Sequence, residues 1–292
     1  MHAVDEPSKQ FRDVYGKRMA YVEAGSGAPI VFLHGNPASS YIWRNIIPAV
    51  AAKGRCIAPD LIGMGCSAKL EGKDPNRYSF LEHRRFLDRL LEELGVVGDV
   101  VLVGQDWGGA LAIDWARRHP LATRGIAYFE TFVRPRSWDD MDPSVRSFFE
   151  RLRSPEGEDM VLRNNVFVEK LLPGRIIRQL TEAEMTVYRR PYLNPGEDRR
   201  PTLTFPRELA VDGTPEHMVK IIEDYGRWMA STDIPKLFIN GEPGAILVGA
   251  MREFCRTWKN QTEVTVRGKH FLQEDSPKEI GQAISNWLDT LG

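Results

Sequence analysis

The segment 104–109 reads GQDWGG and places an aspartate between an apolar run, DVVLVG, and a helical pattern, ALAIDWARRHP. Small residues around Asp106 permit a sharp turn from strand to helix that pushes one side chain out at the top of a sheet. Many enzymes carry serine at such a turn, whereas an aspartate carboxylate is already a nucleophile at neutral pH and needs no base to activate it. Asp106 could alternatively cap the helix that follows, because aspartate is a favoured capping residue.

A second turn follows the apolar run in VFLHGNP at 31–37. A main-chain N–H in such a turn can donate to an oxyanion that forms beside the nucleophile. We expect His34 to be a structural residue, hydrogen-bonded beneath the turn, and not a catalyst. The turn therefore predicts a donor beside Asp106.

His270 follows the run TEVTVRG and comes last in the order nucleophile, acid, histidine. We therefore predict that His270 is catalytic. Two glutamates compete for the acid, because Glu130 ends GIAYFE and Glu242 ends LFINGE, and either could reach the far ring nitrogen. Asp60, which ends RCIAPD, is expected to hold a turn and to take no part in the chemistry.

These residues need a sheet whose strands end at one edge. Strands are predicted over 18–25, as a half-buried edge strand, and over 29–35, 55–60, 99–104, 123–130, 234–242 and 262–268. Helices are predicted over 40–52, 79–95, 110–119, 216–231, 248–258 and 278–291. The alternation of the two patterns predicts an α/β fold with a mostly parallel sheet covered by helices on both faces.

This alternation breaks between residues 131 and 211, which are rich in arginine and proline and contain only helical patterns. We predict a core formed by 1–130 and 212–292, with 131–211 inserted as a helical cap. Insertions at this edge of a sheet commonly cover the ligand site. Apolar side chains of the insertion could line a substrate pocket, although such residues more often form ordinary core: Phe148, Phe149, Phe167, Leu171 and Leu172.

The composition limits the class of partner. The chain of 292 residues has 39 basic and 40 acidic residues and no long block of one sign, so neither nucleic acid nor a membrane surface is expected as a partner. No apolar run approaches roughly 18 residues, and the first residues lack a signal-peptide pattern. Three cysteines without metal spacing suit a reducing compartment. We expect a cytoplasmic protein, a monomer or weak homo-oligomer, without metal or cofactor.

Several segments together carry a family resemblance: HGNPASSYIWRNIIP, DLIGMGCSAK, GQDWGG, YFETFVRP, HFLQEDSP and NNVFVEKLLP. In this order they resemble haloalkane dehalogenases of the α/β-hydrolase superfamily, in the branch whose catalytic acid precedes the cap. The similarity extends over essentially the whole chain. It implies a nucleophile, an acid, a base and two halide-binding side chains, with the N–H groups of the last two forming an oxyanion hole: Asp106, Glu130, His270, Asn36 and Trp107. The role of Glu242 stays open.

The resemblance implies hydrolytic dehalogenation of small, uncharged haloalkanes to alcohol and halide. Displacement of halide by a carboxylate would leave an ester on the aspartate, which water then hydrolyses with the histidine as base. In this interpretation the substrate, water and the halide ion are the only partners.

Three other functions remain open at this point. An epoxide hydrolase resembles this chain but needs cap tyrosines as donors; Tyr188 and Tyr225 are present, whereas Asn36 in the turn favours halide. A coelenterazine-type luciferase is similar to this dehalogenase branch and shares its catalytic residues. Receptors with this type of fold often lack part of the catalytic set, which is intact here.

Overall fold

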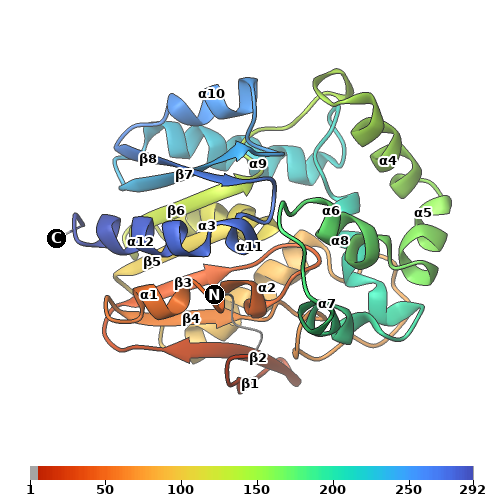
Figure 1. Ribbon diagram of the computed structural model, residues 1–292, viewed down its shortest axis with the longest axis horizontal. Helices are drawn as coiled ribbons and strands as arrows, with labels where there is room; N and C mark the ends of the chain where they lie inside the picture. Colours follow the sequence, from red (N-terminus) through yellow and green to blue (C-terminus); the bar gives the residue numbers. More distant parts are fainter. Residues whose placement is uncertain (1–5, 292) are drawn as a thin grey trace.

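One mostly parallel sheet forms the centre of the computed structural model, which describes residues 6–291 (Figure 1). Among these residues, eight strands lie in the order β1-β2-β4-β3-β5-β6-β7-β8. The pairs β1/β2 and β2/β4 are antiparallel and all other neighbours are parallel. The strands are β1 Gln10–Val14, β2 Lys17–Ala24, β3 Pro29–Leu33, β4 Arg55–Pro59, β5 Val100–Asp106, β6 Thr123–Thr131, β7 Lys236–Pro243 and β8 Gln261–Gly268. Residues 1–5, which begin the segment without a signal-peptide pattern, lie outside the described part.

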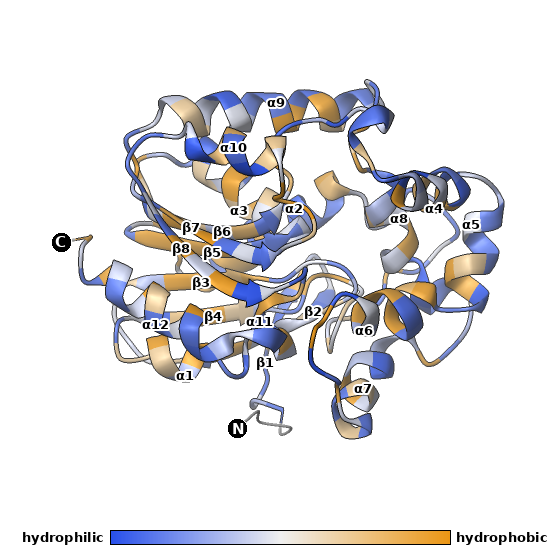
Figure 2. Ribbon diagram, turned by 45° about the horizontal axis from the view of Figure 1, so that its top comes forward, coloured by the Kyte–Doolittle hydropathy of each residue, from blue (hydrophilic) through white to orange (hydrophobic). Residues whose placement is uncertain are grey.

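Helices cover both faces of the sheet, with α1 and α12 on one side and α2, α3 and α9 on the other (Figure 2). The hydrophobic strands lie between these two layers, because a sheet buried on both faces needs apolar residues on both. The helices are α1 Ile47–Val50, α2 Phe80–Glu93, α3 Trp107–Arg118, α4 Pro143–Arg153, α5 Glu156–Glu158, α6 Leu172–Gly174, α7 Glu182–Arg189, α8 Pro201–Arg207, α9 Glu216–Ser231, α10 Ala250–Arg256, α11 Leu272–Asp275 and α12 Pro277–Leu288. The predicted α/β architecture is confirmed.

The structure corrects two expectations. The edge strand is β1, which the sequence did not predict, and β2 lies inside the sheet between β1 and β4. Four of the five β1 residues are exposed, so this strand lacks the buried pattern that reveals a strand. The predicted helix 40–52 is instead a 3₁₀ turn, Ser40–Trp43, followed by α1, because Pro48 in the first turn of α1 has no N–H with which to continue an earlier helix.

Helix α2 is an element whose two ends are set by the local sequence. Its N-cap Ser79 accepts a hydrogen bond from the N–H of Glu82, and Gly95 beyond its end has a φ of +70°. Apolar residues at helical spacing, among them Phe86 and Leu90, face the core. The helix therefore begins and ends close to the predicted range 79–95.

The residues between β6 and α9 form the helices α4 to α8, which lie together beyond the carboxyl ends of the strands (Figure 1). This region corresponds to the predicted insertion, except that Thr131 still belongs to β6. Helix α9 returns to the sheet and packs on α3. The division into core and cap domains stays a prediction.

A buried ion cluster joins this helical region to the sheet-side elements. The guanidinium of Arg44 donates to Glu274 of α11 at 2.7 Å and to Glu184 of α7 at 2.8 Å. Arg178 binds Glu184 at 2.6 Å. Buried charges of this kind need complete pairing, so the cluster fixes α7 relative to the sheet. Within residues 6–291, no helix is both long and apolar enough to cross a membrane.

Candidate active site

Asp106 stands at the junction of β5 and α3, in a backbone conformation that few residues adopt. Its φ is 54° and its ψ is −130°, so the chain turns sharply between strand and helix. It occupies the N-cap position, but its side chain makes no capping hydrogen bond. The carboxylate is therefore free of the capping role that the sequence left open.

Two glycines make this close turn possible. A Cβ at Gly108 would lie 2.1 Å from the carbonyl oxygen of Leu33, and one at Gly35 would lie 2.2 Å from Oδ2 of Asp106. Neither approach is sterically allowed, so only glycine lets the turns after β3 and β5 meet. The two turns together surround the carboxylate.

Main-chain N–H groups stabilise the carboxylate of Asp106. The N–H of Asn36 donates a hydrogen bond to Oδ2 at 2.8 Å, and the N–H of Trp107 follows Asp106 directly in the chain. Burial raises the pKa of Asp106 above its ordinary value, while His270 and these two N–H groups act in the opposite direction. Donors beside the carboxylate thus partly offset the loss of water.

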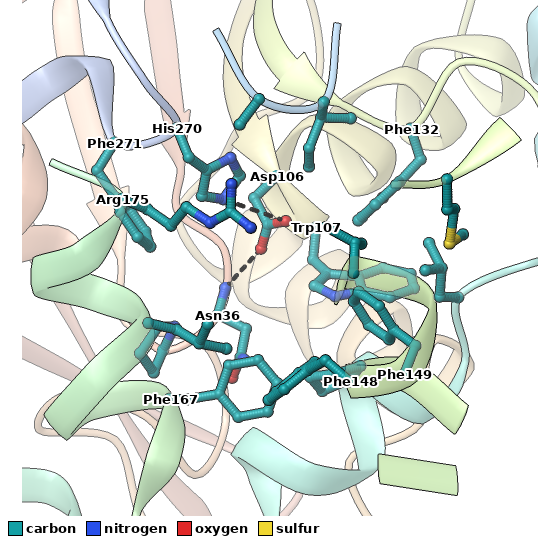
Figure 3. A pocket seen from close by; sticks show the side chains of 18 of the residues that line it. Asn36, Asp106, Trp107, Phe132, Phe148, Phe149, Phe167, Arg175, His270 and Phe271 are labelled. Atoms are coloured by element: carbon teal, nitrogen blue, oxygen red, sulfur yellow. Dashed lines mark hydrogen bonds and ion pairs between the residues drawn. The ribbon is translucent and has the colours of Figure 1, made fainter. Parts of the chain in front are cut away.

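His270 lies between the two carboxylates that its predicted role requires. Its Nε2 is 3.6 Å from Oδ1 of Asp106, and its Nδ1 is 3.3 Å from Oε2 of Glu130. A carboxylate at Nδ1 places the ring proton there and leaves Nε2 as an acceptor facing Asp106 (Figure 3). This is the arrangement of a base oriented by an acid.

Glu130 and Glu242, the two candidates for the acid, have different surroundings. Glu130 is fully buried at the end of β6 and accepts hydrogen bonds from the N–H groups of Ala245, Ile246 and Leu247. Glu242 is exposed and pairs with Arg252 at 3.2 Å. Only Glu130 contacts the histidine.

Gln105 is a site residue that the sequence reasoning missed. Its Nε2 lies 3.1 Å from Nε2 of His270 and 3.2 Å from the main-chain oxygen of the same residue. The side chain is completely buried. Its one sequence signal was its position beside Asp106 in GQDWGG, which does not by itself distinguish a partner of the histidine from a core residue.

A cavity of about 350 Å³ opens beside Asp106 and His270, and Asn36 and Trp107 also line it. The indole of Trp107 stacks on Phe205 of α8, with ring centroids 4.6 Å apart and planes 17° apart. The wall is mainly apolar, which suits an uncharged ligand. Figure 3 shows the aromatic side chains around the nucleophile.

Four of the five predicted pocket residues line this cavity: Phe148, Phe149, Phe167 and Leu171. Leu172 does not. It begins α6, is completely buried and belongs to the main hydrophobic core, since the next residue on a helix faces a different side. Lining residues that the sequence did not indicate are Pro37, Phe132, Arg136, Met141, Ser144, Val145, Arg175, Pro206, Leu209, Ala245, Ile246 and Phe271.

The two residues assigned to turns lie below the site. His34 is fully buried, its Nε2 accepts from the N–H of Leu61 at 3.0 Å, and desolvation lowers its pKa to about 4. Asp60 accepts from the N–H groups of Ser40 and Cys66, both at 2.8 Å. A neutral, hydrogen-bonded His34 and a turn-binding Asp60 are structural. Among the described residues, no group of three or more His, Cys, Asp or Glu could hold a metal ion.

Comparison with known proteins decides the family. Residues 28–277 match the family model described as alpha/beta hydrolase fold. A haloalkane dehalogenase of Sphingobium indicum is 55% identical over 283 residues, which cover 97% of this chain and 96% of that protein. The chain belongs to the haloalkane dehalogenases.

Other haloalkane dehalogenases are also similar to this chain over nearly its whole length. One from Mycolicibacterium smegmatis is 51% identical and covers 96% of this chain and 90% of its own. The crystal structure of the haloalkane dehalogenase DbeA from Bradyrhizobium elkani matches with a TM-score of 0.92 at 44% identity, over 97% of this chain and 98% of that one. The predicted α/β-hydrolase fold and the predicted family are both confirmed.

The buried carboxylate of this dehalogenase generates a prediction about stability: Asp106→Asn should unfold at a higher temperature than the wild type near neutral pH. The pKa of Asp106 is higher in the folded chain than in the unfolded chain. As the pH rises, the unfolded chain therefore releases this proton first. Between the two pKa values the folded state loses stability relative to the unfolded state. Each pKa unit of that rise corresponds to about 1.4 kcal/mol.

Asparagine does not ionise, so the advantage of the variant should grow across this pH window and vanish below it. Thermal unfolding at a series of pH values measures the difference, with the exposed Asp233→Asn as the control. A variant no more stable than the wild type at neutral pH would contradict the prediction.

Proposed function

We propose that the enzyme hydrolyses small, uncharged haloalkanes to an alcohol and a halide through a covalent ester on Asp106. The observation that carries the proposal is the position of this carboxylate, 2.8 Å from the N–H of Asn36 and 3.6 Å from Nε2 of His270, in a mainly apolar cavity. In this proposal the helices α4 to α8 act as the cap. The cytoplasmic location and the monomeric or weakly oligomeric state are kept as predictions.

The first step is displacement at the carbon that carries the halogen. An oxygen of Asp106 forms the new bond to carbon, and the carbon–halogen bond breaks with its electron pair leaving on the halide. The side-chain N–H groups of Asn36 and Trp107 would stabilise the departing anion, which needs donors but no proton. The stack on Phe205 supports this role, because it fixes the plane of the indole at the cavity wall.

The second step is hydrolysis of the ester. Water attacks the ester carbonyl while Nε2 of His270 takes its proton, and Glu130 stabilises the imidazolium. The N–H of Asn36, which already donates to the carboxylate, would receive the oxyanion together with the N–H of Trp107. The oxyanion then collapses to a carbonyl, the single bond between the carbonyl carbon and the alkyl-bearing oxygen breaks, the leaving alkoxide takes the proton from His270 to become the alcohol, and the carboxylate is regenerated. The net change is haloalkane plus water to alcohol, halide and a proton.

The epoxide hydrolase alternative lacks its donors. The hydroxyl of Tyr188 donates to Glu274, and that of Tyr225 donates to the main-chain oxygen of Phe132. Neither tyrosine lines the cavity. No observation in the described residues favours the luciferase alternative over hydrolysis of a carbon–halogen bond.

The proposal predicts different fates for the two steps when the base is removed. In His270→Ala, mixed with excess 1-bromohexane, we expect about one equivalent of bromide per active site and then arrest, because alkylation does not need the base. Rapid-quench bromide release and intact-protein mass spectrometry measure the burst and the alkyl adduct.

The control for this experiment is His217→Ala, which removes a partly exposed histidine outside the cavity and should turn over continuously. Continuous turnover in His270→Ala would remove this histidine from the mechanism.

Because Glu130 contacts the histidine and Glu242 does not, replacing each by glutamine should affect activity differently. Glu130→Gln should lower kcat by a factor of about one hundred or more, since the acid orients the base and stabilises its charge. Glu242→Gln, a change of equal size at an exposed side chain, should keep most of the activity. Steady-state rates with 1-bromohexane compare them, and an equal or larger loss in Glu242→Gln would transfer the role of acid.

A further inference from the structure

The cavity that holds Asp106 is lined by positively charged side chains, although binding of a neutral haloalkane requires none. Two arginines, Arg136 and Arg175, line it, whereas among the described residues Asp106 is the only carboxylate residue in its wall. Arg136 is already bound, because its Nη2 donates to the carbonyl oxygen of Ile246 at 2.7 Å. Arg175 is therefore the cation whose function is unexplained.

The main chain of Arg175 is fixed beside the catalytic histidine. Its carbonyl oxygen accepts hydrogen bonds from the N–H of His270 at 3.1 Å and from the N–H of Phe271 at 3.4 Å. The residue directly follows α6, and its side chain projects into the cavity on the side of His270 (Figure 3). The base of the side chain is thus held in place while its end stays free to meet a ligand.

The guanidinium of Arg175 forms no hydrogen bond or close ion pair within residues 6–291. Arg178, three residues further on, is instead paired with both Glu184 and Glu274. Asp142, at the start of α4, is the carboxylate that competes for Arg175. Its pKa is lowered mainly by hydrogen bonds from Ser144 and only slightly by the charge of Arg175, and it is fully exposed to water. Asp142 is a weak competitor.

We propose that Arg175 binds the carboxylate of haloalkanoates that carry this group at the end remote from the halogen. The inference rests on the proposed function, because the halogen end must still reach Asp106. A guanidinium offers a planar fork that matches a carboxylate with two hydrogen bonds, and the pair strengthens where apolar walls exclude water. Repulsion between the substrate carboxylate and Asp106 turns the chain so that the halogen end approaches the nucleophile.

The test compares two substrates of equal chain length, 6-bromohexanoate and 1-bromohexane, with 8-bromooctanoate and 1-bromooctane as a longer pair. The measured quantity is the ratio of kcat/KM for the anionic substrate to kcat/KM for the neutral one. Arg175→Leu should lower this ratio by about tenfold or more, and Arg175→Lys, which keeps the charge but not the fork, should lower it less. Arg151→Leu, the same charge change at an exposed arginine paired with Glu156, should leave the ratio unchanged.

A second measurement needs no variant. In the wild type, raising the salt concentration should lower kcat/KM for 6-bromohexanoate more than for 1-bromohexane, because salt screens the attraction to the cation.

The outcomes separate this proposal from the proposed function. Wild-type turnover of 1-bromohexane without turnover of either bromoalkanoate overturns the role of Arg175 and leaves the dehalogenase mechanism intact. The role of Arg175 is also overturned if the ratio of the two kcat/KM values in Arg175→Leu stays within about twofold of the wild type. If that ratio is unchanged but inhibition by bromide changes, Arg175 would instead be assigned to the departing halide. Absence of turnover with 1-bromohexane would instead contradict the proposed function itself.

Discussion

In the proposed mechanism, the carboxylate of Asp106 must stay ionised and within reach of a substrate although the protein excludes most of the surrounding water. Burial alone raises its pKa, and the N–H groups of Asn36 and Trp107 counteract this effect together with His270. Those donors can approach because Gly35 and Gly108 leave no side chain between the turns after β3 and β5. The two glycines and the strained backbone thus bring main-chain N–H donors to a buried carboxylate, which favours its ionised form.

The parallel sheet supplies the remaining groups from neighbouring strand ends. Glu130 lies one residue before the end of β6, its carboxylate is fixed by N–H groups of the loop after β7, and His270 follows β8. Groups held on different strands keep their distances, since the strands are joined by hydrogen bonds over their length. The helices between β6 and β7 complete the cavity, and the buried pairs of Arg44 with Glu184 and Glu274 tie them to the sheet side.

The sequence predicted the parts of the structure that follow from local pattern. Continuous apolar runs identified the central strands, and the glycine-rich turn identified Asp106, because both depend on a few adjacent residues. Strand β1 was not predicted, because its exposed residues form no continuous apolar run. The choice between Glu130 and Glu242 needed distances, since both end a strand and only Glu130 lies against the histidine. Such contacts depend on loops that return from distant parts of the chain.

The same limit applies to the walls of the cavity. The sequence placed Leu171 and Leu172 in one group of apolar insertion residues, yet only Leu171 reaches the cavity, because neighbouring residues on a helix point in different directions. Gln105 and Arg175 were missed for a different reason: a polar or charged residue is usually solvated, and only the folded chain shows that these two adjoin the histidine.

The central claim is that Asp106 forms a bond to the substrate carbon and that water later attacks this side chain. It is tested most directly by a single turnover of 1-bromohexane with excess enzyme in oxygen-18 water, followed by mass spectrometry of the peptide that contains Asp106. The account predicts that the label enters the Asp106 carboxylate and that the alcohol carries an unlabelled oxygen. Labelled alcohol together with an unlabelled Asp106 would contradict it.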